Sequence, residues 1–148
     1  MSASTDIWLQ ASSAKTQRIA KDNVGQVVII DRIDGASNAS LDTRTGAVKI
    51  ESDADCLIVA APQVGRENSD GVANFRCWLR VNGVNVPDSN VLLNLPGVDT
   101  KDVIVCQVLV HLEENDVVEV MMATDNAAAG VGIEALQPEV VPENRAGG

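Results

Sequence analysis

Aromatic residues are scarce in this chain, which has one Phe, two Trp and no Tyr among 148 residues. Glycosidases and lectins usually line their sugar sites with aromatic rings, so the scarcity argues against both classes. The chain also lacks a Gly-rich phosphate loop. Its single histidine, His111, lies inside an apolar run rather than beside a nucleophile. We therefore expect no catalytic residues, no cofactor and no enzymatic activity.

Cysteine is present only three times, as Cys56, Cys77 and Cys106, each within an apolar run. An odd number without a C-x-x-C pair is neither a disulfide framework nor a zinc motif. We expect free buried thiols, as in a reducing compartment. Carboxylates are plentiful, but none of their clusters fits the twelve-residue calcium loop, so no metal site is predicted.

Basic residues number 11 against 21 acidic ones, which gives a net charge of −10. Nucleic acid and anionic membrane surfaces are poor partners for such a chain, because both require a positive field. No run approaches the roughly 20 apolar residues of a membrane span. The start of the chain does not resemble a signal peptide. We expect a protein that is made in the cytoplasm and leaves it, if at all, by lysis or within a particle.

Short apolar runs separated by turn residues fill the chain from Gln26 onward. Asn82-Gly83 is a strong hairpin signal, and Asp34-Gly35 is predicted as a turn. The predicted strands are 26–31, 47–51, 56–61, 75–81, 84–86, 91–95, 103–112, 117–122 and 131–136. Because no convincing helix interrupts them, the fold class is all-β, an antiparallel jelly-roll sandwich over residues 26–138. Residues 1–25 are predicted as an N-terminal arm and 139–148 as a flexible tail.

The run 103–112 is apolar on both faces. One face carries Ile104, Cys106, Val108, Val110 and Leu112, and the other carries Val103, Val105, Gln107, Leu109 and His111. Only one face of a sandwich strand meets the core. The second face therefore needs a cover, and we expect a neighbouring subunit to provide it. The N-terminal arm or a loop is the alternative.

Two further features suggest contacts with a partner. Lys15, Arg18 and Lys21 give the first 25 residues a slight positive charge in an acidic chain. These residues are either an arm that grips a partner or a loosely attached terminus. Trp78, between two arginines, either anchors a partner or packs on a neighbouring strand.

Two spaced motifs resemble the trimeric jelly-roll heads of the complement and tumour-necrosis-factor type. The segment Leu79-Arg-Val-Asn-Gly-Val84, followed by Val86 and Ser89, is similar to their L-x-x-N-G-x-x-V hairpin. The segment 112–120, Leu-Glu-Glu-Asn-Asp-Val-Val-Glu-Val, is similar to their L-x-x-G-D-x-V-x-V turn, and 131–136 is similar to their closing strand. The resemblance covers about residues 45–138. Asn115 replaces the usual Gly, Tyr is absent, and no secretion signal or collagen-like stalk precedes the domain.

The resemblance implies a homotrimer with Val103, Val105, Gln107, Leu109 and His111 at the interface. Small acidic trimeric jelly rolls without a stalk resemble the decoration (cement) proteins of tailed-phage heads. This implies a structural protein on the outer capsid surface of a virion, whose partners are its own copies and the major capsid protein. The capsid-binding arm would then include Trp8, Lys15, Arg18 and Lys21. The receptor-binding head of a phage fibre or adhesin is the alternative, although such heads usually follow a long repetitive shaft. A small hydrolase is a third.

Overall fold

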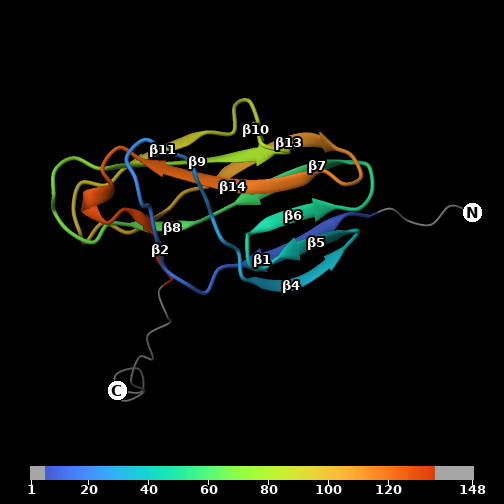
Figure 1. The fold of residues 1–148 in the computed structure, drawn as a ribbon, viewed down its shortest axis with the longest axis horizontal. Coiled ribbons are helices and arrows are strands. Elements are labelled where there is room, and N and C mark those ends of the chain that lie inside the picture. The colour runs from blue at the N-terminus through green and yellow to red at the C-terminus, as the bar shows by residue number, and fades with distance from the viewer. Residues whose placement is uncertain (1–5, 136–148) are drawn as a thin grey trace, which may run out of the picture.

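The structure is a computed structural model that describes residues 6–135, and within them it contains fifteen strands and no α-helix (Figure 1). One layer is a sheet of seven antiparallel strands in the order β10-β9-β14-β6-β5, with β11 beside β9 and β3 beside β14. Their bounds are Gln26–Val27 (β3), Ala39–Asp42 (β5), Ala47–Ile50 (β6), Asn74–Val81 (β9), Val84–Asn85 (β10), Val91–Asn94 (β11) and Val117–Thr124 (β14).

The second layer contains two groups of strands, β13-β7 and β12-β8-β15-β2. Their bounds are Gln17–Arg18 (β2), Ala54–Ala60 (β7), Gln63–Gly65 (β8), Asp102–Val103 (β12), Cys106–Leu112 (β13) and Gly132–Ile133 (β15). A separate hairpin-like pair, Trp8–Ser12 (β1) and Arg32–Ser37 (β4), lies beside β5, and a 3₁₀ turn spans Ala127–Ala129. The all-β antiparallel prediction is confirmed and is consistent with a β-sandwich.

The two groups of the second layer share one ladder. Asp102 pairs with Val64, and Cys106 pairs with Ala60, in one continuous antiparallel register. Midway between these pairs, the Ile104 N–H donates to the Pro62 carbonyl at 3.2 Å. Pro62 has no N–H to return the bond, so the ladder is interrupted there. The predicted strand 103–112 is accordingly split into β12 and β13.

The core between the layers follows the alternation predicted for residues 75–81. Phe75, Cys77 and Leu79 are completely buried, whereas the side chains between them lie on the outer face. From the second layer Val64, Cys106, Val131 and Ile133 pack in the same cluster. Burial of this kind contributes about 1.5–3 kcal/mol for each large apolar side chain.

Turn chemistry explains two of the connections. Asn82 and Gly83 have φ values of 50° and 81°, the left-handed pair that a two-residue hairpin requires. Asn115 has a φ of 74°, so it takes the conformation that the resemblance assigns to Gly.

Asp34-Gly35, predicted as a turn, instead lies inside β4. The indole of Trp8 packs on Gly35 so closely that a Cβ there would be 2.8 Å from the ring. Glycine is needed at this position for a close tertiary approach, and the resemblance of Asp-Gly to a turn signal was misleading.

Residues 6–25, the part of the predicted arm that the structure describes, contain two strands where an irregular segment was predicted. Trp8–Ser12 pairs with β4, Gln17–Arg18 pairs with β15, and Ile19 is buried in the core. Two-residue strands carry almost no periodicity, and it is their distant partners that order them. The predicted tail 139–148 lies outside the described residues.

Candidate functional site

The outer surface of β7 and β13 carries several exposed apolar side chains. Leu109 is 73 % exposed and Leu57, directly opposite it, is 64 % exposed. Val59 and Val105 are each about half exposed, and Gln107 lies opposite Val59. We call these five residues the apolar face. Contiguous exposed apolar side chains of this kind mark interaction surfaces more often than isolated ones do.

All five residues predicted for the interface lie on the solvent side. Gln107, Leu109 and His111 come from β13, Val103 from β12, and Val105 from the segment between them. Sequence reasoning missed Leu57 and Val59, the β7 half of the same surface. Their signal was available, because the run 56–61 is apolar on both faces just as 103–112 is.

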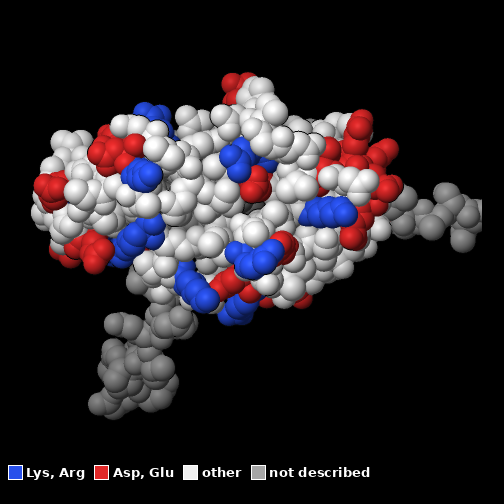
Figure 2. Space-filling view, viewed as in Figure 1, with Lys and Arg blue, Asp and Glu red and all other residues white. Residues whose placement is uncertain are grey.

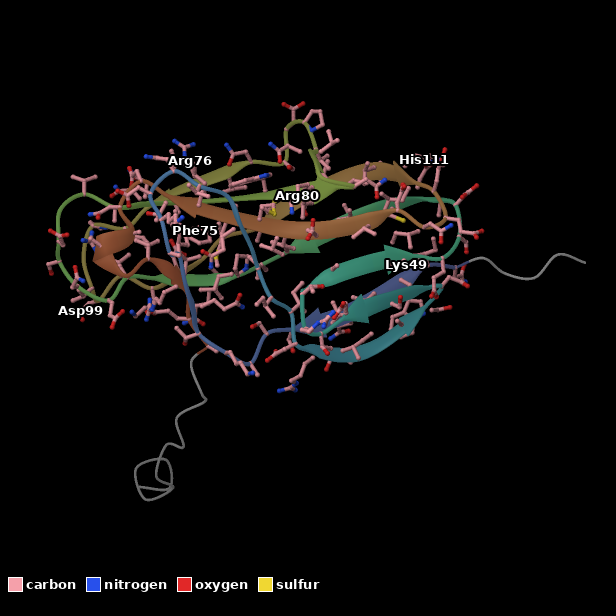
Figure 3. All side chains as sticks on the ribbon, viewed as in Figure 1. Lys49, Phe75, Arg76, Arg80, Asp99 and His111 are labelled. Atoms are coloured by element: carbon pink, nitrogen blue, oxygen red, sulfur yellow. The ribbon has the colours of Figure 1, made fainter. Side chains whose placement is uncertain are left out.

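A polar pair closes one end of the apolar face. His111 Nδ1 lies 2.8 Å from Asp55 Oδ1 on the neighbouring strand. This hydrogen bond raises the pKa of His111, and the nearby charges of Glu113 and Asp53 add to the effect. Figure 3 places His111 at this end of the molecule, where acidic side chains gather in Figure 2. The end is therefore polar and negatively charged, next to an uncharged surface.

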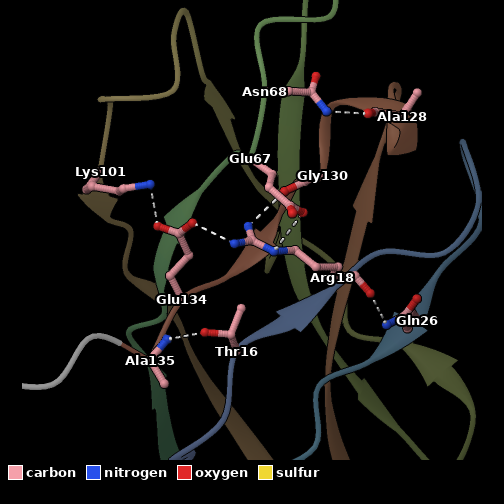
Figure 4. A network of polar contacts seen from close by, with 10 residues as sticks. All are labelled: Thr16, Arg18, Gln26, Glu67, Asn68, Lys101, Ala128, Gly130, Glu134 and Ala135. Carbon is pink, nitrogen blue, oxygen red and sulfur yellow. Dashed lines mark hydrogen bonds and ion pairs between the residues drawn. The ribbon is translucent and has the colours of Figure 1, made fainter.

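The four residues predicted for the arm do not form one surface. Trp8 is 53 % exposed on β1, and Lys15 and Lys21 are exposed in connecting segments. Arg18 instead turns inward: its Nη1 donates to the Gly130 carbonyl at 2.8 Å, and its Nη2 lies 2.9 Å from Glu134 Oε2 (Figure 4).

Glu134 is the centre of this buried ion cluster. Its side chain is 5 % exposed, and Lys101 Nζ lies 2.6 Å from Oε1. Burial by itself raises the pKa of Glu134, but the hydrogen bonds and charges of Lys101 and Arg18 outweigh it, so the pKa is lowered. Gly65 makes room for the carboxylate, since a Cβ there would overlap it. The cluster ties β2 and β15 to the segment before β12 and is a structural feature.

Trp78 packs within the fold. Its Nε1 donates to Asn85 Oδ1 at 2.8 Å, and the ring lies against Gly25, where a Cβ would be 3.1 Å away. The interpretation as packing on a neighbouring strand is therefore the correct one for the side chain in this structure.

A groove of about 1100 Å³ follows the edge of β7 that faces β1. In residues 6–135 β7 pairs only with β13, and β1 only with β4, so neither strand has a hydrogen-bonded neighbour across the groove. The lining is mainly apolar, with Leu9, Ile50, Ile58 and Leu112 among its residues. The groove adjoins the apolar face along β7.

Among residues 6–135 no group of three or more His, Cys, Asp or Glu side chains is placed to hold a metal ion. In the same part of the chain no helix has the length and apolarity to cross a membrane. Comparison with protein-family models gives no match, and comparison with curated protein sequences gives none either.

Proposed function

We propose that this protein is a structural subunit that assembles into a homotrimer of jelly rolls and decorates the outer surface of a viral capsid. The observation that carries the proposal is the apolar face. Burying its four aliphatic side chains would contribute roughly 1 kcal/mol for each half-exposed Leu or Val in every copy. Nothing in residues 6–135 covers this face, so a second copy of the chain is the cover that the proposal assigns.

The strand order supports the jelly-roll part of the proposal. One layer runs β5-β6-β14-β9, with β11 at the edge, and the other runs β2-β15-β8/β7-β12/β13. In the second layer β2 and β15, its first and last strands in chain order, are neighbours. From β7 onward the chain passes back and forth between the layers: β7 and β8 lie in the second, β9 to β11 in the first, β12 and β13 in the second, β14 in the first and β15 in the second. Such alternation between two sheets is typical of jelly rolls.

The proposed role on a capsid fits the surface charge. A net charge of −10 keeps the exposed side of a crowded array soluble, while the apolar face mediates contacts between copies. The capsid contact is assigned to three exposed side chains, Trp8 on β1 and Lys15 and Lys21 in the connecting segments. Arg18, which the sequence placed with them, is bound to Glu134 and is left out of this contact. By binding only assembled shells, the protein would stabilise them through linkage.

The test of assembly compares two leucines. We expect the native chain to show three times its own mass by light scattering at micromolar concentration, and Leu109→Glu to be monomeric. Leu92→Glu is the matched control, because Leu92 is likewise an exposed leucine on a strand, 53 % exposed, but lies on β11 of the other layer. It should remain trimeric. A monomeric native chain, or equal dissociation of both variants, would refute the proposal.

The capsid role needs a separate experiment. Particles produced without this protein should release their nucleic acid at lower temperature than complete particles, and adding the purified protein back should restore the difference. Heat-stable particles that fail to adsorb to host cells would instead indicate a receptor-binding head.

A further inference from the structure

The groove beside β7 is a gap in the second layer of the sandwich. Its floor belongs to the seven-stranded layer, through Val48 and Ile50 of β6 and Val118 and Val120 of β14. Along its sides run β7 and β1, and no strand within residues 6–135 pairs with either of them across the groove. One more strand beside β7 would therefore complete the second layer over an apolar floor.

The hydrogen-bonding pattern shows which backbone groups of β7 face the groove. The Ile104 N–H donates to the Pro62 carbonyl at 3.2 Å, so the even-numbered residues of this strand bond to β13 and the odd-numbered ones point to the other edge. Further along that other edge, the Glu134 N–H donates to the Gln63 carbonyl at 2.9 Å. The edge that β15 pairs with on β8 is therefore the same edge that faces the groove on β7.

The segment that follows β15 begins at this groove. Ala135 lines the groove, and its N–H donates to Thr16 Oγ1 at 3.1 Å. Residues 136–142 come next, with the sequence Leu-Gln-Pro-Glu-Val-Val-Pro, and they lie outside the described residues. Every even-numbered residue of this segment is apolar, and two of its three odd-numbered residues are polar. In an extended strand such a sequence presents one wholly apolar face.

We propose that residues 136–142 of the same chain occupy this groove as a strand antiparallel to β7. Ala135 and Leu136 then both lie opposite Pro62, a β-bulge at the point where the ladder is already interrupted. From there on the even-numbered residues share the side of Cys56, which is half-buried and lines the groove. The apolar face of the segment thus meets the apolar floor. The proposal concerns a single chain and does not depend on the proposed trimer.

The two prolines select the same register as the apolar residues do. In this register the N–H groups of Gln137, Glu139 and Val141 point to the carbonyls of β7, whereas positions 138 and 142 point away from β7. Proline has no N–H to donate, so it is tolerated in a strand where no ladder bond is required of it. A shift by one residue would turn both prolines toward β7 and would turn Gln137 and Glu139 onto the apolar floor.

A cysteine at position 142 tests the docking through a thiol that the groove already contains. In the proposed register Pro142 lies opposite Cys56, in a pair without ladder hydrogen bonds. Such pairs have Cα atoms about 4.5 Å apart, within the range of about 4.4–6.8 Å that a disulfide requires. We expect Pro142→Cys, treated in its native state with oxidised glutathione, to form a disulfide with Cys56 within one chain. After alkylation and cleavage at glutamate without reduction, peptide 52–67 should be joined to peptide 140–143.

Val141→Cys is the matched control, because its thiol lies in the same peptide but on the solvent side of the strand. This thiol should be alkylated. A cross-link to Cys56 from Val141→Cys in place of Pro142→Cys would overturn the register. A covalent dimer on a non-reducing gel would overturn the assignment to the same chain, and alkylation of both variants at both sites would overturn the docking itself.

A second pair of variants tests the contact without cross-linking. Val140→Asp would place a carboxylate against the apolar floor, so we expect it to lower the urea midpoint of unfolding. Gln137→Asp should leave the midpoint unchanged, because residue 137 faces solvent in the proposed register. Equal midpoints for Val140→Asp and Gln137→Asp would contradict the proposal.

Discussion

The outer surfaces of the two layers differ in whether other parts of the chain cover their large apolar side chains. On the seven-stranded layer, Trp78 is covered by Gly25, and Arg80 pairs with Glu119 at 2.8 Å on the neighbouring strand. On the other layer, Leu57 and Leu109 face each other across β7 and β13 with about two thirds or more of their surface exposed. Both surfaces carry large apolar side chains. Trp78 on the first is covered by its own chain, although Val84 and Leu92 on its outer strands are exposed, whereas Leu57 and Leu109 on the second lie side by side and uncovered.

This contrast separates two uses of an apolar residue outside the core. A side chain covered by a local segment contributes to folding and leaves association unchanged. One left uncovered contributes little to folding and is available for association. The crossing of the segment before β3 over β9 and β14, visible in Figure 1, is what makes the difference.

The largest expected effect is a loss of folding stability when the covered side chain Trp78 is removed. Trp78→Ala removes the ring between Gly25 and Met121 and the hydrogen bond to Asn85, so unfolding in urea should require about 2 kcal/mol less free energy. The oligomeric state at native temperature should not change. Trp8→Ala, on a half-exposed ring, should cost about half as much. Equal losses for the two variants would contradict the distinction.

A smaller effect is expected on the uncovered surface. Leu57→Ser should leave the stability of the single chain almost unchanged, because the side chain is 64 % exposed. It should weaken association about tenfold, since roughly 1.4 kcal/mol of apolar burial is lost per contact. Sedimentation velocity over a dilution series measures this, with Leu92→Ser as the control that should not dissociate.

The smallest expected effect concerns the hydrogen-bonded pair of His111 and Asp55 at the polar end of the uncovered surface. Asp55 raises the pKa of His111 above its unfolded value of about 6.5, so the pair stabilises the fold fully below that pH, and this contribution is lost as pH rises through the raised pKa. The thermal midpoint of the native chain should therefore exceed that of His111→Gln more at about pH 5.5 than at pH 8.5.

The carboxyl groups with lowered pKa values, Asp116, Asp125 and Glu134, titrate below this range and do not interfere. Asp55→Asn should remove most of the pH dependence of the difference, since the hydrogen bond to Asp55 is the largest cause of the raised pKa and the charges of Glu113 and Asp53 remain. An NMR titration that gives His111 a pKa at or below 6.5 would contradict the pairing.

Features fixed by neighbours in sequence were the predictable ones. The Asn82-Gly83 hairpin and the burial of Phe75, Cys77 and Leu79 follow from turn chemistry and two-residue periodicity. The outward orientation of Leu109 and its neighbours follows from the same periodicity.

Features fixed by distant partners could not be read in this way. Gly35 is required by Trp8, and β2 is a strand because β15 pairs with it. The contact between Arg18 and Glu134 joins residues more than a hundred positions apart, and a lone Arg in an irregular segment carries no sign of it. The prediction of an irregular N-terminal segment missed β1 and β2 for this reason.

The pairing of β2 with β15, through Arg18 with Gly132 and Gln17 with Ile133, also limits when the second layer can form during synthesis. On the ribosome, β2 emerges early and must wait for almost the whole chain before its partner exists. Until then Ile19 has no closed core to enter, and the second layer lacks its last strand. The second layer therefore cannot close until residues 132–133 have been synthesised, and a pairing over so long a sequence separation is expected to form slowly.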